Sequence, residues 1–395
     1  MKKVRIQKQQ VIFTLFLLFI LIGFYSNILA QGLIIDHNCT DITQIPESSI
    51  NQAKAMLHIG YGHTSHGSQI TTGMTGLVNF ANNGGLGLSH AQDIFAWNNG
   101  GTGGALDLED GDGYGSGWLD HDCGYYPDWV TETRTYLDDP SHSDVNVIIW
   151  SWCGQASSRT EGEMIETYLS PMSQLESDYP NVTFVYMTGH ADGSGESGNL
   201  HLRNQQIRNY CITNNKVLYD FYDIECYNPD GVYFGDQNVT DACSYTGGNW
   251  AIEWQNSHTE GVDWYSCSSA HSQPLNANRK AYAVWWLWAR LAGWDPVTDL
   301  DEFQNVTPAK FTLYQNYPNP FNPSTTINYS IQEPGFVQIN VYDILGTHKE
   351  TIEDKFHSAG NYEIIYNAEN LCSGVYFYEL RIENFRQAKK MILLR

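Results

Sequence analysis

Ser65 is the residue whose type and position first point to chemistry. It lies in the segment 56–70, which reads MLHIGYGHTSHGSQI: an apolar run, a turn bracketed by glycines, and then apolar residues at helical spacing. A strand, a sharp turn and a helix place a hydroxyl at the carboxyl edge of a sheet, where helix N–H groups can bind an anion. The sequence therefore predicts Ser65 as a nucleophile. The alternative is that Ser65 only caps the helix.

The elements that must position Ser65 alternate between buried strands and amphipathic helices. Apolar runs predict strands at 55–59, 145–152, 182–188 and 216–222. Helical periodicity predicts helices at 68–81, 127–137, 162–176, 199–213 and 276–292. This alternation is typical of a three-layer α/β/α fold with a mostly parallel sheet. Active sites of such sheets lie at the carboxyl ends of the strands.

Four segments resemble the conserved blocks of the SGNH (GDSL-like) hydrolase superfamily. Gly62–Gly67 is similar to the first block, with His63 where the family has aspartate. Asn98–Gly101 is similar to the second block. Trp150–Gln155 closes a strand where the third block belongs, and Ser268–Asn276 precedes the last long helix, where the family places its base.

The resemblance implies a flavodoxin-like sheet and a serine esterase, with an acylated carbohydrate as the expected substrate. Ser65 would attack, and His271 would take its proton, because a serine hydroxyl needs a base near neutral pH. The Gly100 N–H and the Gln155 amide would hold the oxyanion. The family's aspartate, three residues before the histidine, is Ser268 here. Another acid, Asp263 being the nearest, or a backbone carbonyl would then orient His271.

Further side chains are predicted to contact the substrate. His190 ends a strand and should point into the same cleft, unless it is a satisfied core histidine. His63 lies within the first block. Trp97 and Trp264 fall in loops and could stack on sugar rings, because an aromatic face matches the apolar C–H faces of a sugar.

Two other functions remain open. The missing aspartate favours a glycan-binding module that keeps the fold without turnover. A metal-dependent hydrolase or polysaccharide lyase could use His63, His66, His190 and His271, although no tight ligand spacing supports it. The sequence otherwise calls for no cofactor.

The composition narrows the partners and the compartment. The formal charge of -23 and the pI of about 4.7 exclude nucleic acid and anionic membranes as general partners. Eight cysteines in an exported chain predict disulfides. Cys153, in a predicted buried strand, is the candidate free thiol, and no CxxC spacing indicates zinc or redox chemistry.

Two long insertions interrupt the predicted elements at 84–126 and 227–270. Loops of this length in a compact domain are usually functional or disordered, and their many aromatic residues argue against disorder. Residues 107–122 are rich in aspartate and glycine. Oxygen ligands on a flexible loop suit calcium, but the EF-hand spacing is absent. A structural calcium site and an ion-free acidic loop both remain open.

The N-terminus reads as an export signal. Four basic residues precede an apolar run from Val11 to Tyr25, and Ala30 is a small residue suited to cleavage. A signal peptide at 1–30 with mature Gln31 is expected, and an uncleaved anchor is the alternative. No other stretch is apolar enough to cross a bilayer.

The chain divides further into a domain at 31–295, a polar linker at 296–308 and short alternating strands at 309–395. The segment 311–327, FTLYQNYPNPFNPSTTI, resembles the opening of the C-terminal sorting domain of the type IX secretion system. Val341–Gly346, Gly374–Phe377 and the basic ending Lys389–Met391 also match. This resemblance implies a β-sandwich, recognition by the type IX machinery, removal of the domain, and surface attachment or release. A carbohydrate-binding sandwich is the alternative.

Overall fold

The computed structural model describes residues 32–111, 118–296, 311–331, 335–357, 360–382 and 385–394. The chain forms two compact units, residues 1–294 and 295–395. The predicted signal peptide at 1–30 and nearly all of the predicted linker lie outside the described residues.

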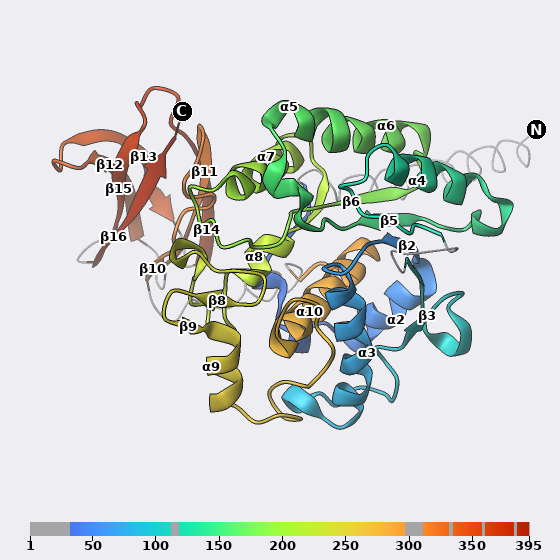
Figure 1. Ribbon diagram of the computed structural model, residues 1–395. Helices are drawn as coiled ribbons and strands as arrows, with labels where there is room; N and C mark the ends of the chain where they lie inside the picture. Colours follow the sequence, from blue (N-terminus) through green and yellow to red (C-terminus); the bar gives the residue numbers. More distant parts are fainter. Residues whose placement is uncertain are drawn as a thin grey trace, which may run out of the picture. The chain divides into compact units, whose positions relative to one another are not determined.

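The first unit is built on a parallel sheet of seven strands in the order β1-β7-β6-β5-β2-β4-β3 (Figure 1). Its strands are β1 (Ile34–Ile35), β2 (His58–Gly62), β3 (Trp97–Asn98), β4 (Leu106–Asp110), β5 (Val147–Trp150), β6 (Thr183–Met187) and β7 (Val217–Tyr219). The spatial order β4-β2-β5-β6-β7 is the 2-1-3-4-5 order of flavodoxin-like sheets. The predicted α/β class is confirmed, whereas this order occurs with many functions and does not by itself identify the SGNH family.

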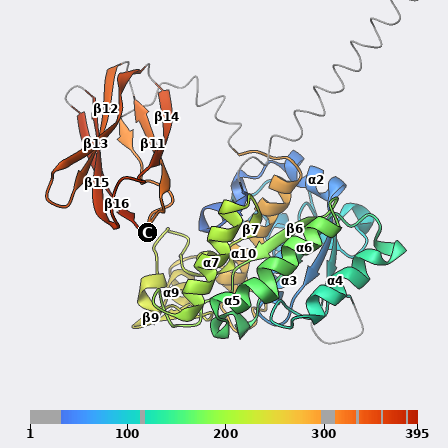
Figure 2. The ribbon, with the colours of Figure 1, turned by 90° about the horizontal axis from the view of Figure 1, so that it is seen from above.

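Helices cover both faces of this sheet (Figures 1 and 2). One face carries α2 (Glu47–Met56), α3 (Ser68–Asn82) and α10 (Pro274–Leu291); the other carries α4 (Asp128–Asp138), α5 (Glu161–Met164), α6 (Ser170–Asp178) and α7 (Asn199–Thr213). Strand β5 shows why: Val147 and Ile149 belong to one hydrophobic core and Ile148 and Trp150 to the other. A strand buried on both faces reads as a continuous apolar run.

The remaining strands and α-helices of this unit lie after β7. They are α8 (Phe221–Glu225), β8 (Ser244–Tyr245), β9 (Gly248–Asn249) and α9 (Trp250–Ser257). Strands β8 and β9 form a separate antiparallel pair, so the predicted insertion at 227–270 is ordered where described.

Two predicted strands are shifted or shortened. Ala55 and Met56 end helix α2, which the sequence analysis missed, and the strand begins only at His58. The predicted strand 216–222 stops at Tyr219. Asp220 then accepts a hydrogen bond from the Asp223 N–H and caps α8, so the chain turns into a helix.

The predicted helix 162–176 is continuous but changes its winding. A π-helical turn, Ile165–Leu169, separates α5 from α6. Pro171 lies in the first turn of α6. Because proline has no N–H to donate to the preceding turn, the helix widens there.

The acidic run that suggested calcium is partly a strand. Leu106 and Leu108 of β4 are buried, so Asp107 and Glu109, which alternate with them, follow the two-residue period of a strand. The described carboxylates have separate partners: Asp107 contacts His58, and Asp110 contacts His63. Residues 112–117 lie outside the described part, and the described carboxylates of 107–122 do not converge on a common point. Calcium therefore stays a prediction of the sequence.

The cysteines do not pair. All eight are free thiols, so the prediction of disulfides is wrong for this structure. Cys123, Cys211, Cys226 and Cys243 are fully buried among the apolar side chains of the α4–α7 core. Free cysteine commonly acts as a small apolar residue in this way.

The second unit has two antiparallel sheets. One has three strands, β10 (Thr312–Leu313), β11 (Ser324–Ile331) and β14 (Gly360–Asn367). The other has four, β12 (Gly335–Asp343), β13 (His348–His357), β15 (Gly374–Ile382) and β16 (Phe385–Leu393). Side chains of both sheets share one core, which is the packing of a β-sandwich.

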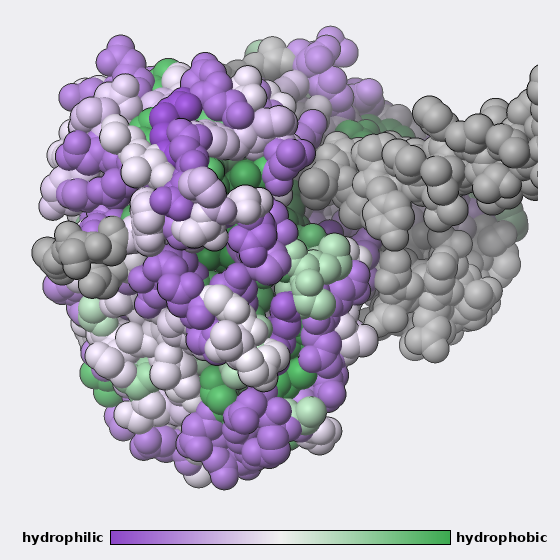
Figure 3. Space-filling model, turned by 90° about the vertical axis from the view of Figure 1, so that its right-hand side faces the viewer, coloured by the Kyte–Doolittle hydropathy of each residue, from purple (hydrophilic) through white to green (hydrophobic). Residues whose placement is uncertain are grey.

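The surface carries little continuous apolar area on the face drawn in Figure 3, where hydrophilic residues predominate and hydrophobic ones lie scattered. Within the described residues, none of the helices combines the length and apolarity that a bilayer span requires.

Candidate active site

Ser65 lies at the turn between β2 and α3, next to the point where the sheet order reverses. Helix α3 begins at Ser68 with Gly67 as its N-cap, so Ser65 does not cap it. A side chain at position 67 would meet His63 Cβ at 2.4 Å and Ser151 Oγ at 2.5 Å, so this turn requires glycine. The Ser65 hydroxyl is 3.2 Å from Nε2 of His271, which is exposed and precedes α10. Two residues far apart in sequence thus form a hydroxyl–imidazole pair.

A second pair lies against the first. The Cys153 thiol, just beyond β5, is 3.0 Å from Nδ1 of His66, and Nε2 of the same ring is 3.0 Å from Oδ2 of Asp241. Cys153 Sγ is also 3.8 Å from Ser65 Oγ. A thiol, an imidazole and a carboxylate in a row have the geometry of a nucleophile, its base and an orienting acid.

The hydrogen bonds of this row shift the proton from sulfur to nitrogen. Burial alone would raise the pKa of Cys153, but the hydrogen bond and charge of His66 outweigh it and lower that pKa to about 7. Burial alone would lower the pKa of His66, but its bonds to Asp241 and Cys153 raise it to about 9. A thiolate–imidazolium pair is therefore well populated at neutral pH.

His66 is the middle ring of a stack of three histidines. His190 stacks on it at 3.7 Å between ring centroids, and His271 at 4.4 Å. Burial lowers the pKa of His190, which keeps that ring neutral. Its Nδ1 is 3.0 Å from the Ala191 carbonyl, and its buried Nε2 has no partner among the described residues. His190 thus offers an open hydrogen-bond acceptor beside the two pairs.

His66, His190 and Asp241 are close enough together to be considered as metal ligands. Ligand atoms of His66, His190 and Asp241 lie within 4.8 Å of one another. The rings of His66 and His190, however, are parallel to within 1°. A metal ion must lie close to the plane of each imidazole that binds it, and stacked parallel planes do not meet. The Nε2 atom of His66 is moreover bonded to Asp241. We therefore do not assign a metal to this cluster.

Gln155 and His63 lie near the pairs without touching Ser65. Gln155 Nε2 is 3.4 Å from Oδ2 of Asp122, which also accepts a 2.5 Å hydrogen bond from the Thr64 hydroxyl. The Asp122 carboxylate therefore links the Gln155 amide to Thr64, the residue that precedes Ser65. His63 is buried, and its Nε2 is 2.7 Å from Asp110, so it joins the turn before Ser65 to the end of β4.

Three other predicted residues are not brought to Ser65. The Gly100 N–H donates to Asp107, which contacts His58 at the opposite, amino end of β2. Trp264 packs against the core on the α4–α7 side. Asp263, the predicted acid partner, accepts from the Thr259 N–H, and no described carboxylate lies within ion-pair distance of His271.

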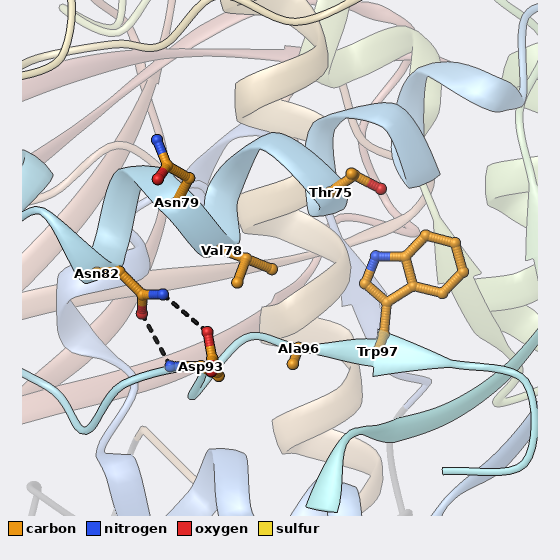
Figure 4. A pocket seen from close by; sticks show the side chains of 7 residues that line it. All are labelled: Thr75, Val78, Asn79, Asn82, Asp93, Ala96 and Trp97. Carbon is orange, nitrogen blue, oxygen red and sulfur yellow. Dashed lines mark hydrogen bonds between the residues drawn. The ribbon is translucent and has the colours of Figure 1, made fainter. Parts of the chain in front are cut away.

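Trp97 lines a hollow of about 540 Å³ between α3 and the segment before β3 (Figure 4). Asn82 and Asp93 are joined there by two hydrogen bonds, and Thr75 and Asn79 add polar groups. An aromatic face beside amides and a hydroxyl is a suitable combination for a sugar. This hollow is separate from the histidine stack.

A buried ionic network holds the loops that carry two of the histidines. Lys280 on α10 and Glu225 on α8 are fully buried and 2.5 Å apart. The same carboxylate accepts the Ala191 N–H, and Lys280 Nζ also bonds to Gln69, whose amide donates to the Ala270 carbonyl. The network therefore fixes the backbone next to His190 and His271.

The sequence analysis did not assign chemistry to Cys153 and Asp241, and it considered His66 only as a metal ligand. The sequence could have indicated His66 and Cys153, because both follow strands whose carboxyl ends meet at one edge of the sheet. Asp241 lies in the long segment after β7, which has no periodicity. Its loop pairs with the loop after β6 through a bridge between Asp192 and Thr240. Only the folded chain places it.

Comparison with known proteins identifies the second unit. Residues 315–394 match the family described as the secretion system C-terminal sorting domain. The chain therefore carries a type IX sorting domain and is exported to the cell surface or the extracellular space. No curated protein matches the chain.

The solved structures that match this chain have low TM-scores. PorU from Porphyromonas gingivalis is 21% identical over 22% of this chain and 10% of its own, with a TM-score of 0.19. PorZ, a surface component of the type IX system of the same organism, is 18% identical over 22% of this chain and 11% of its own, with a TM-score of 0.16. The chain spans about a tenth of each. An endo-β-1,4-mannanase from Thermotoga petrophila is 7% identical over 63% of this chain and 47% of its own, with a TM-score of 0.16. These scores assign no fold or function to the first unit.

Export leads to one testable expectation about processing. We expect the exported protein to begin at Gln31 and to end near residue 309, because the ends of the sequence read as a signal peptide and a removable sorting domain. Intact-mass measurement of protein released from the cell surface and from culture supernatant checks both ends. An exported chain that retains residues 311–394 would contradict removal of the sorting domain.

Proposed function

We propose that the first unit is a secreted hydrolase of carboxylic esters, of the SGNH-like serine type, with Ser65 as nucleophile and His271 as base. The observation that carries this is the 3.2 Å separation of Ser65 Oγ and His271 Nε2 at the carboxyl edge of the sheet. The Ser65 hydroxyl donates its proton to His271 as it attacks the ester carbonyl, and His271 gives that proton to the alkoxide when the ester C–O bond breaks. Water then gives a proton to His271 and attacks acyl-Ser65, and His271 returns the proton to the Ser65 oxygen as the carboxylic acid leaves. His271 is exposed, so a substrate can reach the pair from solvent.

The substrate class that we propose is an acylated carbohydrate. Export brings the protein to extracellular material. The hollow at Trp97, which is separate from the histidine stack, offers an aromatic face and polar groups to which a sugar chain could bind away from the ester. We also propose His190 as a substrate contact, because its ring stacks beside the two pairs.

A fluorophosphonate probe tests the nucleophile directly. The wild-type protein should become labelled at Ser65, and His271→Ala should remain nearly unlabelled, because the hydroxyl attacks only when its proton is accepted. Peptide mapping by mass spectrometry identifies the residue. A wild type that binds glycans, hydrolyses no ester and takes no label at Ser65 would replace this proposal with a glycan-binding module.

Gln155 is the proposed side-chain donor to the oxyanion. Gln155→Ala is expected to lower kcat by about 10²–10³ with little change in KM, because such a donor acts mainly in the transition state. Steady-state kinetics on an acetylated saccharide measure both constants. Gln174, exposed on α6 and bonded to the Asp178 carboxylate, provides the matched control as Gln174→Ala. An unchanged kcat in Gln155→Ala would remove Gln155 from the mechanism.

A further inference from the structure

Cys153 has the surroundings of a nucleophile, but the proposed esterase mechanism does not use it. The esterase mechanism employs Ser65 and His271, yet Cys153, His66 and Asp241 form a complete and separate row with 3.0 Å at each step. A buried structural thiol would have no need of a base. Two other half-buried cysteines show the contrast: desolvation raises the pKa of Cys39 to about 12 and that of Cys267 to about 11.

We propose that Cys153 is a second nucleophile of this protein, which accepts acyl groups from thioesters, with His66 as its base and Asp241 as the positioning carboxylate. The sulfur is half-buried in the loop after β5 and lies 3.8 Å from Ser65 Oγ, so an acyl group that reaches Ser65 also reaches the sulfur. This role needs no contribution from the Ser65 hydroxyl.

The reaction is a transfer followed by hydrolysis. The Cys153 thiolate attacks the thioester carbonyl, a new C–S bond forms, and the carbonyl π electrons move to oxygen. When the carbonyl re-forms, the original C–S bond breaks and the leaving thiolate takes the Nδ1 proton of His66. Water then gives a proton to the same nitrogen and attacks acyl-Cys153, which releases the carboxylic acid and the thiolate.

The chemistry of the leaving group sets the substrate class. The tetrahedral intermediate expels the weaker of its two bases. With a thioester both candidates are thiolates, so the acyl group passes readily to Cys153. With an alkyl ester the alkoxide is the far stronger base, so the intermediate loses the Cys153 thiolate and returns to the starting ester. Unactivated alkyl esters should therefore depend on Ser65, and thioesters should also acylate Cys153. The two nucleophiles can be separated by the choice of substrate.

The first experiment measures thiol reactivity in the full chain. Iodoacetamide pulses between pH 5.5 and 9, read by peptide mass spectrometry, should give a Cys153 rate that rises with pH around a midpoint near 7, because the thiolate forms as pH passes its pKa. At pH 6 it should react about 5-fold faster than an unperturbed cysteine of equal exposure. Cys372, exposed on the sorting unit, is the internal reference.

The variants test the roles of His66 and Asp241. Asp241→Asn should move the midpoint upward by about one pH unit or more, because the imidazolium loses its counter-charge. His66→Gln should remove the low midpoint altogether. A midpoint that is the same in wild type and Asp241→Asn, or a wild-type Cys153 whose midpoint is no lower than that of Cys372, would overturn the proposal.

The second experiment uses the acetyl thioester of N-acetylcysteamine. Ser65→Ala should still form acetyl-Cys153, detected as an adduct that neutral hydroxylamine removes, and Cys153→Ser should form none. If Ser65→Ala loses ester hydrolysis and keeps this adduct, both proposals stand. If it keeps ester hydrolysis, the serine mechanism fails alone. If Cys153 takes no acetyl group, the thiol proposal fails alone.

Discussion

Ser65→Ala is expected to lower kcat/KM for an alkyl ester or an acetylated saccharide by at least about 10⁴-fold, and His271→Ala should do the same. The reason is that hydroxyl and imidazole act as one unit across 3.2 Å, so that removing either stops the attack. The double variant should be hardly worse than either single one, because residues that act together are not additive. Initial rates of acid release, measured across the four proteins, check this.

The control for this prediction is Ser68→Ala. Ser68 begins α3, and its hydroxyl donates only to the Ser65 carbonyl, so it tests disturbance of the turn without removal of the attacking oxygen. Ser68→Ala should keep the hydrolysis rate within a few-fold. Full activity in Ser65→Ala, or an additive loss in the double variant, would show that Ser65 and His271 are not a catalytic pair.

Lys280→Met is expected to destabilise the first unit by about 3–5 kcal/mol, because it leaves the Glu225 carboxylate buried without its cation. Both side chains are 0% exposed, so water cannot replace the lost partner. The ammonium group also lies 3.5 Å from the centre of the Phe221 ring, a contact that methionine keeps only in part. Urea unfolding of the mature protein, followed by tryptophan fluorescence, measures the change.

Two further variants separate the buried charge from other effects. Lys280→Met/Glu225→Gln removes both charges, keeps an acceptor for the Ala191 N–H and should recover at least half of the loss. Arg134→Met breaks the exposed ion pair with Asp178 and should cost no more than about 1 kcal/mol. A Lys280→Met protein as stable as the wild type would show that the buried pair does not hold the α8–α10 contact.

Lys280→Met is also expected to lower the rate of ester hydrolysis. Glu225 and Gln69 hold the backbone beside His190 and His271, so their network fixes the loop that carries the proposed base of Ser65 and the loop of the neighbouring histidine. At temperatures where Lys280→Met remains folded, its hydrolysis should fall more than its helix content. Circular dichroism and initial rates measured on the same sample compare the two.

The sequence by itself determined the long helices, four strands of the parallel sheet and the export of the chain. Apolar runs and helical periodicity predicted α7 to the residue, as Asn199–Thr213, because its ends depend on short-range signals. The sorting unit was recognised from contiguous motifs for the same reason. Ser65 was predicted from a strand, a glycine turn and a helix, all within fifteen residues.

Tertiary structure alone decided which side chains meet. Gly100 belongs to the predicted second block but lies at the amino end of β2, because β3 is an edge strand paired with the first two residues of β4. Asp241 carried no local signal and reached His66 through a loop that pairs with the loop after β6. Periodicity records which face of an element is buried, and it carries no information on which distant loops share an edge. The thiol–imidazole–carboxylate row depends on three such loops, so it became visible only in the folded chain.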